Sequence, residues 1–157
     1  MSLPEAGLHE VRPLAAHPFV TAGTGRDLRM IATGSITAGR FGLLEYRLDA
    51  RTRGASPHYH TTFSESFFVL YGTMTLYVAG QWRPCEPGDF AIAHERGVHG
   101  FRNDGAEPSS VLILFTPGIA REAFFAEMAE IGRSGRTPTK EELDAIYARH
   151  DQVMVDL

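Results

Sequence analysis

Two histidines that lie two positions apart, His58 and His60, are the first residues in this sequence with the chemistry and spacing of a metal site. On a β-strand, side chains at positions i and i+2 point to the same face, so these two imidazoles would lie side by side. Glu65 can supply an oxygen ligand and His99 a third imidazole. We therefore predict that these four residues bind one metal ion.

The segment between the second histidine and the glutamate must turn if this site is to form. A fully extended chain from His58 to Glu65 would span roughly 23 Å, which is far more than one ion can bridge. The intervening residues, Thr61–Ser64, are few and mostly polar, as expected of a turn. The sequence therefore predicts that the chain folds back between the two ligands.

The ligand types restrict both the metal and its role. Imidazoles and a carboxylate suit one divalent transition metal ion, which could be Fe, Mn, Ni, Co, Cu or Zn, and the set contains no thiolate. Four protein ligands would leave one or two positions open on an octahedral ion, where water, a small-molecule substrate or O₂ can bind. Open positions are typical of catalytic metals, so the pattern favours an enzyme.

The composition is that of one globular domain. The chain has 157 residues, of which 43% are hydrophobic and 22% are charged. A formal net charge of −4 and the lack of a basic run argue against nucleic acid as a partner. We find no signal peptide pattern and no apolar run of about 18 residues, and so expect no membrane association. The single cysteine, Cys85, fits a cytoplasmic protein.

The elements that must position the ligands are short strands. Between residues 30 and 118, segments rich in β-formers alternate with turn residues, and the clearest segments are 41–48, 66–71, 74–79, 98–102 and 111–116. About eight such strands at close spacing predict an all-β, antiparallel sandwich or barrel. We predict a β-barrel over residues 30–118, preceded by an N-terminal arm over residues 1–29 that is rich in glycine and proline.

The spacing of apolar residues changes after Gly118. Phe124, Met128 and Ile131 occur at helical spacing, and Thr139 with Glu142 forms the pattern of a capping box. Residues 119–157 are therefore predicted to form a C-terminal helical tail that belongs to the same domain. We expect it to pack on the sheet or on a second subunit.

Two motifs around the predicted ligands resemble those of the cupin superfamily. The first cupin motif is similar to Gly54…His58-x-His60-x₄-Glu65-x₆-Gly72, and the second to Gly88-x₅-His94…His99-x₃-Asn103. The 15 residues between them, 73–87, match the short separation of small microbial cupins. The resemblance covers roughly residues 41–118. It implies a jelly-roll barrel that holds one metal ion through His58, His60, Glu65 and His99.

The chain departs from this pattern at two points, of which the first is that Gly54 lies one residue nearer His58 than usual. At the second point, a loop, His94 and Arg96 stand where the second motif usually has proline and glycine, which concerns the shape of the loop more than the ligand His99. The layout of the whole chain is similar to small single-domain cupins described as quercetin-dioxygenase-like.

The resemblance implies a metal-dependent dioxygenase that acts on a small aromatic or enolisable organic substrate, with Glu65 as the candidate general base. Thiol dioxygenases of the superfamily lack this glutamate, so its presence points away from cysteine-type substrates. Two alternatives remain open, because one fold hosts many functions. One is an O₂-independent isomerase, cyclase or lyase, and the other is a non-enzymatic small-molecule-binding cupin.

Four further residues are candidates for substrate binding. Phe67 and Val69 share the strand face of Glu65, and Phe101 shares that of His99, so they would line an apolar pocket, with plain core packing as the alternative. His94 precedes the last ligand on a loop and could contact substrate at the mouth of the barrel.

The segment from Ser66 to Tyr71 is apolar on both faces and therefore needs cover on both sides. We accordingly expect the protein to form a homodimer.

Overall fold

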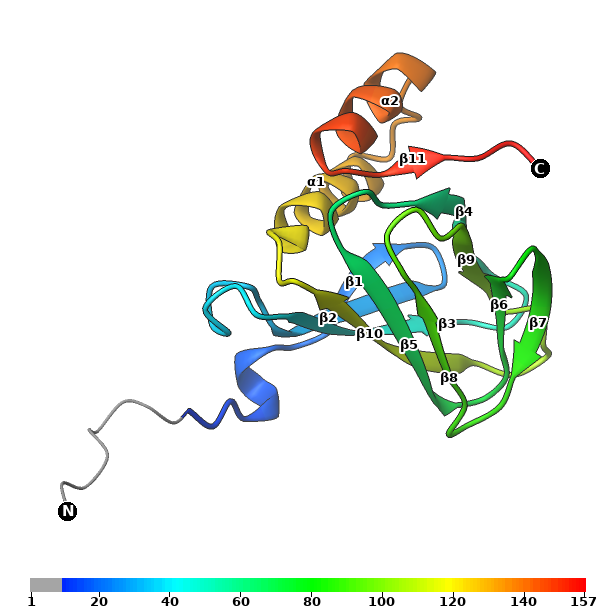
Figure 1. Cartoon of the computed structure of the whole chain (residues 1–157), viewed down its shortest axis with the longest axis horizontal. Helices are drawn as coiled ribbons and strands as arrows, with labels where there is room; N and C mark the ends of the chain where they lie inside the picture. The colour runs from blue at the N-terminus through cyan, green and yellow to red at the C-terminus, as the bar shows by residue number, and fades with distance from the viewer. Residues whose placement is uncertain (1–9) are drawn as a thin grey trace, which may run out of the picture.

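The computed structural model describes residues 10–157, and its strands form two antiparallel sheets. The six-stranded sheet runs in the order β1 (Val20–Gly23), β2 (Arg26–Ala32), β3 (Gly42–Leu48), β10 (Ser109–Thr116), β5 (Ser64–Tyr71) and β8 (Phe90–Ala93). The five-stranded sheet runs in the order β11 (Val153–Met154), β4 (Arg53–Tyr59), β9 (His99–Arg102), β6 (Met74–Val78) and β7 (Gln81–Cys85). Figure 1 shows the two sheets facing each other, with the helices beyond one end.

The prediction of a mostly antiparallel β fold is confirmed, but the described strands do not close into a barrel. Strands β1 and β8 form the edges of the first sheet, and β11 and β7 form those of the second. Closure would require hydrogen-bonded pairing between these edges, as in a continuous barrel. The architecture of residues 10–157 is therefore a sandwich of two sheets.

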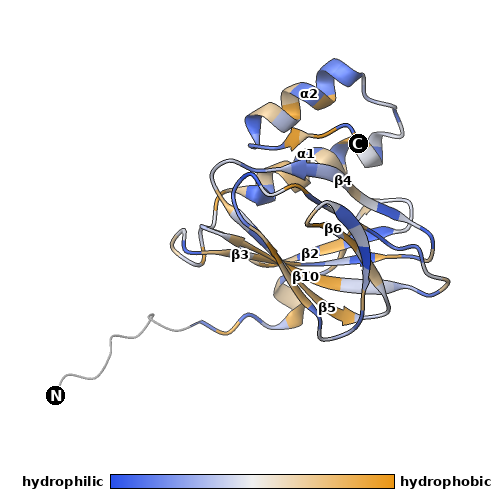
Figure 2. Cartoon of the chain, turned by 45° about the vertical axis from the view of Figure 1, so that its right-hand side comes forward, coloured by the Kyte–Doolittle hydropathy of each residue, from blue (hydrophilic) through white to orange (hydrophobic). Residues whose placement is uncertain are grey.

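The core lies between the sheets and comes mainly from alternate residues of the central strands. The largest fully buried apolar side chains are Phe63, Phe67, Phe115, Leu44, Leu48, Met74, Leu76 and Ile113. Figure 2 shows hydrophobic residues gathered along β3, β10 and β5. Burial also alternates along the middle of β5, but the outward residues Phe68 and Leu70 are apolar as well and are exposed on the outer face. The predicted cover on both sides of this strand is therefore not provided by the described part of the chain.

The predicted N-terminal arm is wrong over residues 20–29. These residues form β1 and the start of β2, which pair as a hairpin and extend the larger sheet. Gly25 has φ +68°, which glycine adopts readily in a tight turn, so this residue connects two strands. Leu28 is buried in the core as a result. A 3₁₀ turn, η1 (Leu14–Ala16), precedes the hairpin, and residues 1–9 lie outside the described part.

The C-terminal segment contains two helices and then returns to the sheet. Helix α1 spans Arg121–Ser134 and α2 spans Lys140–Arg149. The predicted capping box is confirmed, because the Thr139 hydroxyl accepts a hydrogen bond from the Glu142 backbone. The segment is not purely helical, since β11 pairs with β4 opposite His58 and Tyr59. This return brings residues 150–154 beside the predicted metal ligands.

No helix within residues 10–157 is both long enough and apolar enough to cross a membrane.

Candidate metal centre

The four predicted ligands come together in the interior. One potential ligand atom from each of His58, His60, Glu65 and His99 lies within 4.8 Å of the others, and all four residues are buried. His58 and His99 face each other across the β4–β9 pair, and Glu65 arrives from β5 in the other sheet. The two sheets therefore both contribute donors, which explains why residues 34 or more positions apart converge.

Backbone carbonyls orient the three imidazoles. The Nδ1–H groups donate to nearby carbonyl oxygens, from His58 to Ser56 at 2.7 Å, from His60 to Asp151 at 2.6 Å and from His99 to Gly97 at 2.8 Å. A proton held on Nδ1 leaves the Nε2 lone pair of each ring free for a metal. This second set of contacts is typical of histidine ligands in metal proteins.

The Nε2 atoms of two rings meet the carboxylate. Nε2 of His60 lies 2.9 Å from Oε2 of Glu65, and Nε2 of His99 lies 3.0 Å from the same oxygen. Oε2 accepts a hydrogen bond from each ring that carries a proton at Nε2. An ion between these atoms would replace those protons, because metal binding requires deprotonated ligands.

The buried surroundings shift the titration of these groups. Burial lowers the pKa of His58 to about 3, so this imidazole stays neutral. Burial opposes ionisation of Glu65, but the charge of His99 and hydrogen bonds from His60 and His99 outweigh it and hold the pKa of Glu65 well below its ordinary value. Burial likewise opposes protonation of His99, yet the Glu65 carboxylate raises its pKa. The cluster therefore favours an ionised glutamate, which a cation can bind.

A loop from the C-terminal segment fixes the turn between the ligands. The Asp151 carboxylate accepts hydrogen bonds from the backbone N–H and the hydroxyl of both Thr61 and Thr62, at 2.7–3.0 Å. The backbone carbonyl of Asp151 also holds the ring of His60. Sequence reasoning missed this residue, because the contact spans 90 positions and Asp151 resembles any other surface acid.

The donor set fits a single metal ion. Three imidazole nitrogens and one carboxylate oxygen, gathered in a buried space, match the preference of divalent transition metals for nitrogen and oxygen ligands. The described residues gather no cysteine at this cluster, since Cys85 lies on β7.

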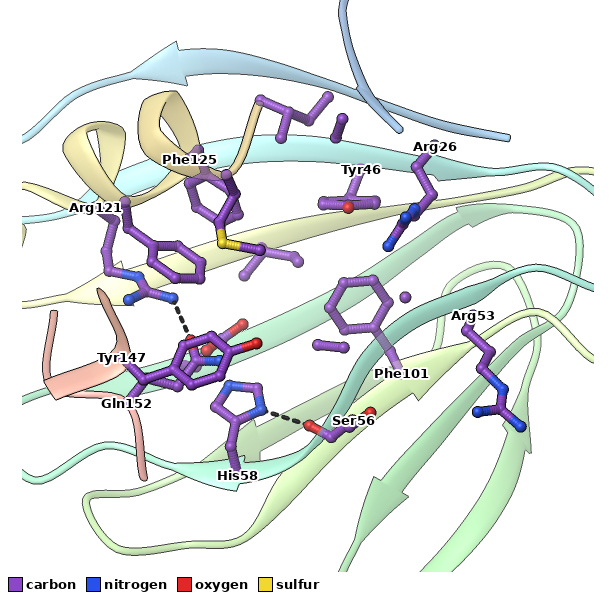
Figure 3. Close-up of a pocket in the computed structure, with 18 of the residues that line it drawn as sticks. Arg26, Tyr46, Arg53, Ser56, His58, Phe101, Arg121, Phe125, Tyr147 and Gln152 are labelled. Carbon is purple, nitrogen blue, oxygen red and sulfur yellow. Dashed lines mark hydrogen bonds between the residues drawn. The ribbon is translucent and has the colours of Figure 1, made fainter. Parts of the chain in front are cut away.

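A cavity of about 320 Å³, called the site cavity below, adjoins this cluster and is lined in part by His58, Glu65, Phe101, Arg121 and Gln152. Figure 3 shows its side chains, with Arg121 and Gln152 close to His58 and with Arg53 at the opposite end. A buried donor cluster that opens into a partly apolar cavity has the layout of a small-molecule site.

The four predicted substrate-binding residues are placed differently from one another. Phe101 lines the site cavity. Phe67 and Val69 are fully buried in the core, and the ring centroid of Phe67 lies 5.7 Å from that of His99. His94 is exposed and lines a separate surface pocket with Tyr77. The core alternative therefore describes Phe67 and Val69, and His94 is not at the mouth of the site cavity.

Several lining residues that sequence reasoning missed come from the C-terminal segment. Helix α1 supplies Arg121, Phe124, Phe125 and Met128, while Tyr147 and Gln152 follow from α2 and the loop after it. The helical spacing of Phe124 and Met128 indicated an apolar helix face. It did not indicate that this face covers the site.

Comparison with known proteins places these observations in a family context. Residues 44–115 match the family model described as a cupin domain. The chain is 32% identical over 108 residues to a quercetin 2,3-dioxygenase of Bacillus subtilis, a match that covers 68% of this chain and 31% of that protein. The chain spans 31% and 50% of the lengths of two curated relatives that it matches.

Solved structures show the same fold. A sugar phosphate isomerase from a cupin superfamily, of Silicibacter pomeroyi, is 28% identical with a TM-score of 0.52, and the match covers 68% of this chain and 67% of that one. The polyketide cyclase RemF of Streptomyces resistomycificus is 18% identical with a TM-score of 0.58, covering 69% and 80% respectively. Both likenesses support a jelly-roll arrangement of the two sheets.

Proposed function

Because this chain belongs to the cupin superfamily, we propose that it is a metal-dependent dioxygenase acting on a small aromatic or enolisable organic substrate. The observation that carries the proposal is the convergence of His58, His60, Glu65 and His99 beside a partly apolar cavity. The 32% identity to a quercetin 2,3-dioxygenase supports the reaction type.

The four residues of the cluster would hold one divalent transition metal ion. The ion would supply a Lewis-acidic position at which a substrate hydroxyl is acidified and O₂ is activated. The protein itself contributes the orientation of the three rings, through the carbonyls of Ser56, Gly97 and Asp151.

Glu65 is the residue placed to move a proton. Its carboxylate lines the site cavity and stays ionised, since its pKa is well below the ordinary value. A carboxylate of this kind is a weak base and takes protons only from a hydroxyl that is already acidic. An enol or a phenol next to a cation meets this condition, whereas an aliphatic alcohol does not.

Oxygen consumption tests the proposal directly. The purified protein, loaded in turn with Fe, Mn, Ni, Co, Cu and Zn, is incubated with a flavonol or a β-diketone in an oxygen electrode. We expect uptake with at least one redox-active ion and ring- or chain-cleaved products by mass spectrometry. The variant Glu65→Gln should lose uptake, while Glu45→Gln, which alters a buried carboxylate outside the cavity, should retain it.

A second candidate is an isomerase, cyclase or lyase that does not use O₂. The 28% identity to a sugar phosphate isomerase favours this candidate, since the two proteins share the fold and the match covers about two thirds of each chain. Full conversion of substrate under argon by the Zn- or Ni-loaded protein would select this candidate. Metal-loaded protein that consumes no O₂ with any flavonol or diketone would contradict the first.

We also propose that the protein is a homodimer, formed through the outer face of β5 and the edge strand β8. Four exposed apolar side chains lie on these neighbouring strands, namely Phe68, Leu70, Phe90 and Ile92. Such a patch on an unpaired sheet edge is typical of an interface between chains. Sedimentation velocity should give a dimer for the wild type and a monomer for Phe90→Lys. The variant Ile36→Lys, at an exposed residue outside the patch, should remain a dimer.

A further inference from the structure

The charges that line the site cavity are mostly positive. Three arginines line it, Arg26, Arg53 and Arg121, and Glu65 is the one acidic residue among the described residues that do so. That glutamate is already engaged by His60 and His99. None of the ion pairs among residues 10–157 includes any of the three arginines.

Arg121 is the most unusual of the three, because it is buried without a carboxylate. Its residue is 3% exposed. The guanidinium donates from Nη1 to the His150 carbonyl and from Nη2 to Oε1 of Gln152, both at 3.1 Å. Its Nε–H has no hydrogen-bond partner in the structure. A buried charge with only neutral acceptors carries a large desolvation cost, so this arginine lacks the partner that its position demands.

The surroundings of Arg121 hold the guanidinium in place without neutralising it. Phenyl rings surround it at 4.1–5.6 Å from the guanidinium carbon to the ring centroids, and they belong to Phe63, Phe115, Phe124 and Phe125. Aromatic faces attract a cation but accept no hydrogen bond in its plane. Burial lowers the pKa of Arg121 to about 10, and the charges of Glu65 and Asp151 offset only part of that effect. Glu65 would itself be bound by a metal ion.

Apolar side chains form much of the remaining wall of the site cavity. They include those of Leu28, Tyr46, Phe101, Ile113 and Met128. Arg53 is exposed and lies opposite Arg121 in Figure 3, so this end of the cavity adjoins solvent. A ligand that enters there passes apolar walls and reaches a buried cation beside the donor cluster.

From this arrangement we infer that the substrate is a small organic carboxylate with an apolar body, and that Arg121 binds its carboxylate. The inference rests on the proposed function in one respect, since it takes the site cavity as the place where substrate binds. A guanidinium offers parallel N–H groups that match the two oxygens of a carboxylate, which a hydroxyl or an amide does not replace. Arg26 and Arg53 at the other end attract an anion toward the opening.

Binding measurements with a matched pair of probes test this inference. Cinnamate and its neutral isostere cinnamamide are titrated by calorimetry into the wild-type protein, with and without bound Zn. We expect cinnamate to bind more than 10-fold tighter than the amide in both forms. Equal binding of the two probes would overturn the inference.

Variants assign the effect to the buried arginine. Arg121→Gln should bring the preference for cinnamate over cinnamamide close to one, and Arg121→Lys should retain part of it. Arg40→Gln, at an exposed arginine that lines no described cavity, should leave the preference unchanged. If Arg121→Gln fails to fold, the Lys variant and the wild-type probe pair decide the matter. A folded Arg121→Gln protein that keeps the full preference would overturn the assignment.

Titration with phenyl phosphate tests whether the anionic group that Arg121 binds is a carboxylate or a phosphate. Tighter binding of phenyl phosphate than of cinnamate would overturn the carboxylate assignment in favour of a phosphate. Arg121-dependent binding of cinnamate, with no O₂ uptake and no conversion under argon, would support this inference while the proposed function fails. The two failures are therefore distinguishable.

Discussion

Two glutamates are buried in the larger sheet, and their partners differ in kind. Glu45 on β3 and Glu65 on β5 are 2% and 4% exposed. The carboxylate of Glu45 is held by Arg29 at 2.7 Å, by Arg47 at 3.0 Å and by the Ser110 hydroxyl at 2.7 Å. The carboxylate of Glu65 has only the imidazoles of His60 and His99.

This difference explains which of the two carboxylates can do chemistry. Guanidinium groups ordinarily stay charged throughout the physiological pH range, so the ion pairs around Glu45 are lasting structural contacts. Imidazoles change their charge near neutral pH and can give up a proton to bind a metal. A buried glutamate therefore stabilises the sheet at position 45 and is a candidate metal ligand at position 65.

The largest expected effect comes from removing the charge of Glu65. Glu65→Gln should weaken binding of the divalent ion by more than about 100-fold, because an anionic ligand is replaced by a neutral amide. Calorimetric titration of chelator-treated protein with Zn or Ni measures this change. Glu45→Gln is the matched control and should retain wild-type affinity. If the two variants bind the ion alike, the distinction between the two carboxylates is wrong.

The reverse experiment concerns stability. Glu45→Gln should lower the free energy of unfolding by about 2 kcal/mol, because it leaves the Arg29 guanidinium without its carboxylate in a mostly buried position. Urea denaturation of the chelator-treated protein measures the change. An unchanged midpoint would show that the Glu45 cluster does not stabilise the sheet.

A smaller effect on metal binding should follow from a substitution that leaves His60 in place but removes the contacts that orient its ring. Asp151→Ala removes the acceptor for Thr61 and Thr62 and frees the loop whose carbonyl orients His60. We expect roughly 10-fold weaker metal binding, in the range seen for contacts behind the ligands. Asp144→Ala, at an exposed acid on α2, serves as the control. An Asp151→Ala protein with wild-type affinity would show that the C-terminal loop does not position the ligand.

The smallest effect is a pH dependence that belongs to Glu45. Burial opposes its ionisation, but hydrogen bonds from Ser110, Arg29 and Arg47 outweigh it and lower the pKa of Glu45 from 4.5. Its contribution to stability is therefore present above about pH 4.5 and is lost as the pH falls toward the folded-state pKa. Between pH 6 and pH 4, the wild type should lose more unfolding free energy than Glu45→Gln. Parallel losses would contradict this account.

Several residues show which parts of the site and the fold could be predicted from the sequence alone. His58 and His60 at i and i+2, the turn before Glu65 and the later His99 identified the four residues that do converge, since strand periodicity is a local property. The shift to helical spacing after Gly118 predicted the two C-terminal helices. The glycines at 23 and 25 were misread as breaks in an arm, because turn residues look the same in a hairpin and in a loop.

What lies around the ligands could not be read from the sequence. Arg121 became a buried cation and Asp151 became the support of His60 only when α1, α2 and β11 folded back over the site. Phe67 and Phe101 looked equivalent by strand face and both pack in the core, yet of the two only Phe101 also lines the cavity.

The sequence by itself determined the donor set, because ligand identity and strand alternation are fixed by residue type and local spacing. The tertiary structure alone decided which charges remain unpaired in the cavity and which loops orient the rings. Those features depend on contacts between residues as far as 91 positions apart, such as His60 and Asp151, and no local pattern encodes them.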